Sequence, residues 1–236
     1  MVTIENIYDP IGPLFGKVGF TKDISESVIG VEFENETKEP FEHPSVRGWQ
    51  FQPEGSLRYC GFEYVLKTPV PINQAKGHIQ NLFKWIDTRR EAIPLTNSIR
   101  TSTHVHFDVT KWTYIDLLRF STIYWILEET LSSFCGETRK GNLFCLRLKD
   151  ASYAQNVIAA SLERGEIFPR SLTHNDYRYA SLNFSSVSKF GSIEFRMMRG
   201  VDKVKDIYSW IDVLEKIKTY SFALETPLDV REAFLK

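Results

Sequence analysis

The residues best suited to chemistry in this sequence occupy alternate positions of segments whose pattern is typical of β-strands. Successive side chains of a strand point to opposite sides of the sheet, so residues two apart share a face. The polar side chains that share a face of their segments in this way are Glu32 and Glu34, Glu63, His104, His106 and Asp108, and Glu194 and Arg196. An ordinary solvent-facing sheet has no reason to select carboxylates on one strand and imidazoles on another, so the pattern indicates a site.

These residue types suit metal-assisted phosphate chemistry. Carboxylate oxygens are ligands for hard divalent cations such as Mg²⁺, and a neutral imidazole can complete a mixed site that also takes Mn²⁺. Arg196 adds a planar cation suited to bidentate contact with phosphate oxygens, and Arg178 is a second candidate. Several anionic ligands around more than one metal ion would form a binding site for a polyphosphate.

Each of these groups also has a purely structural interpretation. The two glutamates of the first strand are by themselves typical of a solvated strand face, and the two histidines can form a structural pair. Glu194 beside Arg196 is also what a cross-strand ion-pair network would use. The coincidence of all three patterns on separate strands favours a functional site over these alternatives.

The elements that must position these residues can be read from the periodicity of the apolar residues. Strands are predicted at 29–34, 49–52, 57–67, 103–109, 181–186 and 192–198. Helices are predicted from Asn73, as the capping residue, to about 90, over 113–134 ending at Gly136, over 150–164, and over 202–224. Hairpin-like neighbouring strands with separate helical blocks indicate an α+β fold, with a mostly antiparallel sheet covered by helices on one face.

Composition excludes several classes of protein. The 236 residues carry a net charge of −1 and are 42% hydrophobic, which predicts one globular domain over 1–236 and gives no support to a nucleic-acid-coating surface. The apolar stretches are too short for a transmembrane helix, and the first ten residues lack the pattern of a signal peptide. Three cysteines without a CxxC pair fit neither a disulfide framework nor a structural zinc site, so a reducing, cytoplasmic compartment is expected.

An ordered set of motifs carries a family resemblance. The motifs are GVEFE at 30–34, PEGSL and FEYVLKTP within 53–69, THVHFDV at 103–109, and RYASLNF with SIEFRMMRG within 178–200. Over residues 29–200 the chain resembles the amidoligase family, carboxylate–amine ligases related to glutamine synthetase and glutamate–cysteine ligase and common in phage and bacterial genomes. The resemblance implies a glutamine synthetase-like curved, mostly antiparallel sheet and a phage-encoded protein working in the host cytoplasm.

The resemblance also implies a division of labour among the site residues. ATP and Mg²⁺ or Mn²⁺ are the expected cofactors. By analogy, the metal nearest the γ-phosphate would be held by Glu32, His104 and Glu194, a second ion by Glu34 and Glu63, and the nucleotide phosphates would lie towards His106. Arg178 and Arg196 would neutralise the γ-phosphate and then an acyl-phosphate. Glu54 stands where the family has the Asp of a DGS turn.

The implied reaction is ATP-dependent formation of an amide or isopeptide bond through an acyl-phosphate, in which phosphoryl transfer needs positioning and charge stabilisation. The candidate general bases are Asp108, Glu36 and Glu54. Two alternatives stay open, a metal-dependent hydrolase built on the HxHxD strand and a catalytically inert binding module. ATP consumption would separate a ligase from a hydrolase.

The substrates are not readable from the sequence. Small-molecule or peptide carboxylates and amines are the expected partners, and their specificity is expected to lie in the loops 35–48, 136–147 and 165–177. A ligase of this type could in principle acylate an amine on a modified base, but the near-neutral charge gives no support to a nucleic-acid partner. No membrane partner is expected, and the oligomeric state is open.

Overall fold

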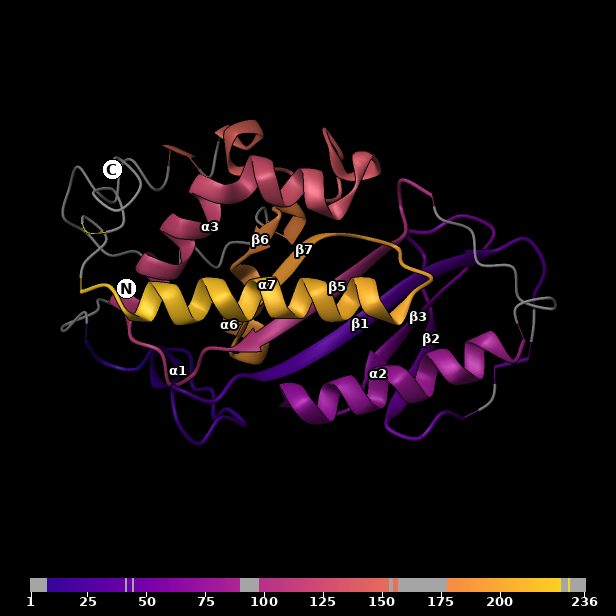
Figure 1. The fold of residues 1–236 in the computed structure, drawn as a ribbon, viewed down its shortest axis with the longest axis horizontal. Helices are drawn as coiled ribbons and strands as arrows, with labels where there is room; N and C mark the ends of the chain where they lie inside the picture. The colour runs from indigo at the N-terminus through magenta and orange to yellow at the C-terminus, as the bar shows by residue number, and fades with distance from the viewer. Residues whose placement is uncertain are drawn as a thin grey trace.

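The fold is an α+β arrangement built around one sheet (Figure 1). The structure, a computed structural model, describes residues 8–40, 42–43, 45–89, 98–152, 155–156, 178–225 and 229. The strands are β1 Val28–Thr37, β2 Trp49–Pro53, β3 Cys60–Leu66, β4 Val70–Pro71, β5 Ser102–Asp108, β6 Leu182–Asn183 and β7 Ser192–Arg199. The helices are α1 Ile11–Leu14, α2 Ile72–Asp87, α3 Tyr114–Cys135, α6 Ser185–Phe190 and α7 Val204–Phe222, with 3₁₀ turns η1 Glu137–Arg139 and η2 Leu148–Asp150.

The sheet has the order β2-β3-β1-β5-β7-β6, with the short β4 paired to β1. Every paired set of named strands is antiparallel. The predicted α+β class with a mostly antiparallel sheet is therefore confirmed. The sheet is not strongly curled in Figure 1, so the glutamine synthetase-like curvature stays an expectation.

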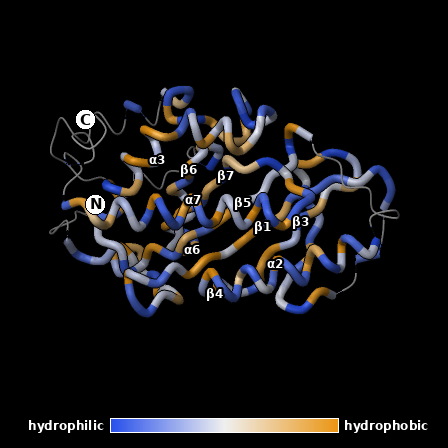
Figure 2. The backbone as a smooth tube through the Cα atoms, in the orientation of Figure 1, coloured by the Kyte–Doolittle hydropathy of each residue, from blue (hydrophilic) through white to orange (hydrophobic). Residues whose placement is uncertain are grey.

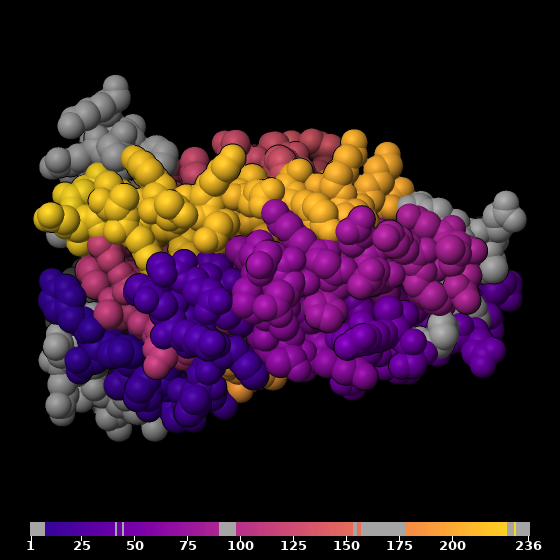
Figure 3. Space-filling view, turned by 60° about the horizontal axis from the view of Figure 1, so that its bottom comes forward, coloured from indigo at the N-terminus to yellow at the C-terminus, as the bar shows by residue number. Residues whose placement is uncertain are grey.

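Helices α2, α3 and α7 cover one face of this sheet (Figures 1 and 3). The apolar side chains of the strands belong to the same hydrophobic core as those of these helices. On β1, for example, the Phe33 ring lies 5.4 Å from the rings of both Trp49 and Phe83, which joins the sheet to α2. In Figure 2, α2 and α7 alternate between hydrophobic and hydrophilic residues along their length, as amphipathic helices on a core do. None of the helices within the described residues is long and apolar enough to cross a bilayer.

The predicted elements are largely confirmed, with two corrections. The segment 181–186 is not one strand, because β6 ends at Asn183 and α6 begins at Ser185. The Asn183 Oδ1 atom accepts hydrogen bonds from the Ser185 backbone N–H (2.8 Å) and hydroxyl (2.7 Å), which turns the chain out of the strand. The capping residue of α2 is Pro71 rather than Asn73.

Helices α3 and α7 lie close to where the sequence predicts them. Helix α3 ends at Cys135 with Gly136 as its C-cap, so the predicted stop at this glycine is confirmed. The helix predicted at 150–164 lies mostly outside the described residues, and α2 ends at Asp87, with Thr88 as its C-cap, slightly before the predicted end at about 90. The apolar stripe predicted for the last helix is buried at Ile207, Ile211, Leu214 and Ile217.

A β-bulge interrupts the pairing of β5 and β7. Val105 pairs with Phe195 and Thr103 pairs with Met198, so Arg196 and Met197 together lie opposite His104. Because of the extra residue, Met197 and Met198 are both buried in the core although they are adjacent in sequence. The bulge therefore lies in the part of the sheet that carries the candidate site.

The side chain of Arg139, from η1, fastens this bulge. It is 1% exposed, and its guanidinium donates to the carbonyl oxygens of Arg196 (2.7 Å), Met197 (3.2 Å) and Thr101 (3.5 Å). No Asp or Glu among the described residues forms an ion pair with Arg139, so these backbone carbonyls are the main hydrogen-bonding compensation for its burial.

Candidate functional site

The register of the sheet brings the sequence-predicted residues together on the face opposite to α2, α3 and α7. Glu32 of β1 lies across from His104 of β5, and Glu34 of β1 lies across from Glu63 of β3. His106 of β5 lies across from Glu194 of β7. Directly opposed residues of an antiparallel pair place their side chains on the same face, within contact distance.

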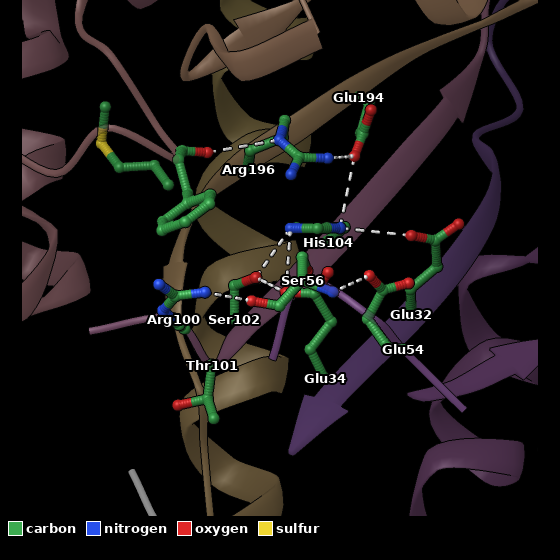
Figure 4. A network of polar contacts seen from close by, with 12 residues as sticks. Glu32, Glu34, Glu54, Ser56, Arg100, Thr101, Ser102, His104, Glu194 and Arg196 are labelled. Carbon is green, nitrogen blue, oxygen red and sulfur yellow. Dashed lines mark hydrogen bonds and ion pairs between the residues drawn. The ribbon is translucent and has the colours of Figure 1, made fainter. Parts of the chain in front are cut away.

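His104 is the centre of this cluster (Figure 4). Its Nδ1 atom lies 3.2 Å from Glu32 Oε2 and 3.3 Å from Glu194 Oε1. One ligand atom from each of the three residues lies within 4.8 Å of the other two. Two carboxylates and an imidazole are donors that suit Mg²⁺ or Mn²⁺, so the residues present fit a divalent cation.

The charges in the cluster are mutually dependent. Burial raises the pKa of Glu32, but the charge of the nearby His106 and the close contacts of both histidines with this carboxylate outweigh burial and hold the pKa of Glu32 well below 4.5. Burial likewise opposes ionisation of Glu194, and the charge of Arg196 more than compensates, which lowers the pKa of Glu194. Both carboxylates are therefore ionised at neutral pH, as metal ligands must be.

A cavity of about 310 Å³ opens over the cluster. The carboxylates that line it are Glu32, Glu34, Glu54, Glu63 and Glu194, and the cationic side chains among the described residues that line it are Arg178, Lys189 and Arg196. Residues of α6 also contribute, so this short helix lies on the site face, unlike the three long helices. An open, polar cavity of mixed charge suits a charged ligand more than an apolar one.

The predicted second group of carboxylates lies at one side of this cavity. Burial, reinforced by the negative charges of Glu32, Glu34 and Glu54, raises the pKa of Glu63 from 4.5 to about 7, although a hydrogen bond from Gln52 opposes the shift. Among the described residues no Lys or Arg forms an ion pair with Glu34, Glu54 or Glu63. A cation bound here would meet carboxyl groups without Lys or Arg partners among these residues and would displace the proton that the raised pKa favours on Glu63.

The raised pKa of Glu63 predicts a pH dependence of stability in the metal-free protein. Between pH 4.5 and about 7 the unfolded chain ionises at this position while the folded chain keeps its proton, so stability falls as pH rises and levels off above the folded pKa. The shift of the Glu63 pKa corresponds to roughly 3 kcal/mol, and solvent screening in the open cavity reduces this value, so we expect Glu63→Gln to remove a loss on the order of 2 kcal/mol across this window. Urea unfolding of the parent and the variant at pH 5 and pH 8 measures the difference.

The control for this experiment is Glu137→Gln, because the Glu137 side chain is 81% exposed. This control should follow the parent at both pH values. If Glu63→Gln also follows the parent, the carboxyl at position 63 does not carry the expected proton.

The structure places the three remaining predicted residues differently. Arg196 forms an ion pair with Glu194, and its Nε atom lies 3.4 Å from the Phe144 carbonyl oxygen (Figure 4). Arg178 is exposed at the cavity edge, with its guanidinium 4.5 Å from the centre of the Tyr179 ring. His106 lies 3.4 Å from Glu32 through Nε2 and is outside the cavity lining, so a direct role on the nucleotide phosphates has no support from its position.

The three candidate general bases lie in different surroundings. Asp108 accepts hydrogen bonds from the backbone of Phe20, Thr21 and Thr110, and so fastens the loop that precedes β1. Glu36 is fully buried and accepts from the Arg58 backbone N–H at 2.8 Å. Of the three candidates only Glu54 lines the cavity, where it accepts from the Ser56 backbone N–H at 2.8 Å.

Sequence reasoning missed three residues of the site. Asn183 donates to Glu194 at 2.6 Å, Gln52 donates to Glu63, and Ser102 contacts both His104 and Glu34. The period of β5 places Ser102 on the same face as His104, which is the signal that could have identified it. Of the loops expected to set specificity, 165–177 lies outside the described residues.

Comparison with known proteins shows a family relationship. A family model described as "Putative amidoligase enzyme" matches residues 36–218, which is more than half of the chain. The matched range contains His104 and Glu194, whereas Glu32 and Glu34 lie just before it. No curated protein matches the chain.

Proposed function

Because the chain belongs to the amidoligase family, we propose that it is an ATP-dependent carboxylate–amine ligase that forms an amide or isopeptide bond. The observation that carries the proposal is the cluster of Glu32, His104 and Glu194 at the base of a charged cavity. The membership itself suggests an enzyme, and the cluster supplies donors for the divalent cation that ATP-dependent phosphoryl transfer requires.

The proposed reaction has two steps. A carboxylate oxygen of the first substrate attacks the γ-phosphorus of ATP, which breaks the bond to the β-phosphate and gives an acyl-phosphate and ADP. The amine of the second substrate then attacks the acyl carbon, the bond to the phosphate oxygen breaks, inorganic phosphate leaves, and the amine gives up a proton. Activation is needed because an unmodified carboxylate has no adequate leaving group.

The residues of the cavity divide the work as follows. Glu32, His104 and Glu194 would hold a Mg²⁺ or Mn²⁺ ion, and Glu34 with Glu63 would hold a second. When bound, these ions neutralise charge on the transferred phosphoryl group. Arg196 and Arg178 supply positive charge to the phosphate oxygens, and the ion pair with Glu194 keeps the Arg196 guanidinium directed along the site face.

The hydrogen bonds of Asp108 argue against the hydrolase alternative. A hydrolase built on the HxHxD strand would need Asp108 as a ligand or base, but this carboxylate is occupied by backbone donors of the loop before β1. The inert-module alternative leaves the three clustered ligands without a purpose. ATP consumption separates the ligase from both alternatives.

The expected substrates are small-molecule or peptide carboxylates and amines. The lining consists mostly of carboxylates, cations, serines and Asn183, together with the rings of Tyr179 and Phe190, and its charges and hydrogen-bonding groups favour polar substrates. The net charge of −1 continues to give no support to a nucleic-acid partner.

Nucleotide binding tests this proposal. We expect ATP with Mg²⁺ to raise the melting temperature by about 5 °C or more at ligand concentrations of about 100 times Kd, and either ligand alone to raise it less. Glu32→Ala should abolish the combined effect, because it removes a ligand of the central cluster, whereas Glu137→Ala at an exposed position should retain it. No shift with ATP and Mg²⁺ in the parent at several millimolar would overturn the proposal.

A further inference from the structure

Ser102 connects the two groups of carboxylates in the cavity. It is the first residue of β5, is 2% exposed and lies two positions before His104, on the same face. Its hydroxyl oxygen lies 2.8 Å from His104 Nε2 and also makes a short hydrogen bond with Glu34 Oε2 (Figure 4). One hydroxyl therefore contacts a residue of the central cluster and a residue of the second carboxylate group.

The direction of these hydrogen bonds follows from counting protons. The Ser102 hydroxyl donates its single proton to Glu34 Oε2. The Ser102 oxygen then has only lone pairs to offer to His104. The contact of 2.8 Å is favourable only if the Nε2 atom of His104 carries a proton and donates it.

This fixed proton determines the character of the other ring nitrogen. A neutral imidazole protonated at Nε2 has a lone pair at Nδ1, and here Nδ1 faces oxygens of Glu32 at 3.2 Å and Glu194 at 3.3 Å. A lone pair directed at two carboxylates is repulsive, so Nδ1 carries either a proton or a metal ion, and a divalent cation bound here takes the place of that proton. The hydrogen bond from Nε2 to the serine is thus the outer contact that typically orients a metal-bound histidine.

We propose that Ser102 is a positioning residue that holds His104 in its Nε2–H tautomer and thereby makes Nδ1 a metal ligand. The inference rests on the proposed function, since it assumes a divalent cation in the central cluster. Through the same hydroxyl, Ser102 links the orientation of His104 to Glu34. The two metal positions are therefore coupled by one side chain that touches neither the metal nor the substrate.

Mn²⁺ binding to the purified protein without nucleotide tests this role. We expect Ser102→Ala to weaken Mn²⁺ affinity by about 10- to 100-fold, as loss of an outer hydrogen-bonding partner of a ligand does. Ser102→Thr keeps the hydroxyl and should restore most of the affinity. The matched control is Thr103→Val, because Thr103 is the next residue of β5, is equally buried, and has a hydroxyl without a hydrogen-bond partner among the described residues.

The tautomer itself is measured separately, so that the test does not depend on the variants folding. A long-range ¹H–¹⁵N spectrum of the Mg²⁺-loaded parent should place the ring proton of His104 on Nε2. A proton on Nδ1, or equal Mn²⁺ affinity in the parent and in folded Ser102→Ala, overturns the role of Ser102. A parent that binds no Mn²⁺ at millimolar concentration overturns the metal site of the proposed function as well, which distinguishes the two failures.

Discussion

Glu194→Gln is expected to weaken Mn²⁺ binding by at least about 100-fold and to abolish ATP-dependent phosphate release. Loss of a residue that only hydrogen-bonds to a metal ligand costs up to about 100-fold in affinity, so loss of a ligand itself should cost at least as much. Glu194 is one of two carboxylates facing His104 Nδ1, at 3.3 Å. The amide keeps the shape of the side chain but removes the negative charge. It also leaves Arg196 without its anionic partner, so the charge that would meet phosphate loses its orientation.

Two measurements check this result, Mn²⁺ titration followed by electron paramagnetic resonance and a phosphate-release assay with candidate amines and carboxylates. The control is Glu128→Gln, because Glu128 is also a buried glutamate, is 5% exposed, and accepts hydrogen bonds from Ser181 and Leu148 away from the cavity. Parent-like Mn²⁺ affinity in folded Glu194→Gln would show that the central cluster is not the metal site.

Arg139→Met is expected to destabilise the protein by about 3 kcal/mol, since each buried polar group left unsatisfied costs about 1–3 kcal/mol. The substitution removes the donor to the carbonyl oxygens of Arg196, Met197 and Thr101. Two of these carbonyls belong to the β-bulge, where the ladder between β5 and β7 cannot supply the usual partners. Loss of the unfavourable burial of the guanidinium offsets part of the cost, which keeps the expected value below the sum of three carbonyls.

Urea unfolding measures this loss, and Lys140→Met is the control. Lys140 is the next residue, and its ion pair with Glu137 at 2.8 Å is at the surface, so its removal should change stability by less than about 1 kcal/mol. A change of similar size in Arg139→Met would show that water or a shift of the backbone satisfies the bulge carbonyls.

Much of the site was predictable because sheet geometry is periodic. Alternation placed Glu32, His104 and Glu194 on one face of their strands before any pairing was known. The sequence alone does not determine which strands are neighbours, and it is the order β1-β5-β7 that brings these three side chains into contact. The assignment of ligands to particular ions came from the family resemblance and stays a prediction.

The features that were predicted wrongly or not at all have local physical causes. Within the strand predicted at 181–186, Leu182 and Phe184 alternate with polar residues, but the Asn183 side chain accepts hydrogen bonds from Ser185 and a helix begins there instead of a continued strand. The bulge at Arg196 was not foreseen, although two adjacent buried methionines are what an extra residue in a strand produces. Ser102 was overlooked because a serine has no distinctive chemistry until its two partners are known.

The strand order also has a consequence for the newly synthesised chain. Translation delivers β1 first, then β5, and β7 only after most of the described chain has been made, at about 5–20 residues per second. Until β7 joins, β5 is an open edge that presents His104 and His106, and a strand edge of this kind is prone to pair with other chains. On the ribosome, His104 and His106 are therefore synthesised several seconds before Glu194. A divalent ion that binds His104 and Glu194 together would help β7 to pair with β5 and so to cover the exposed edge.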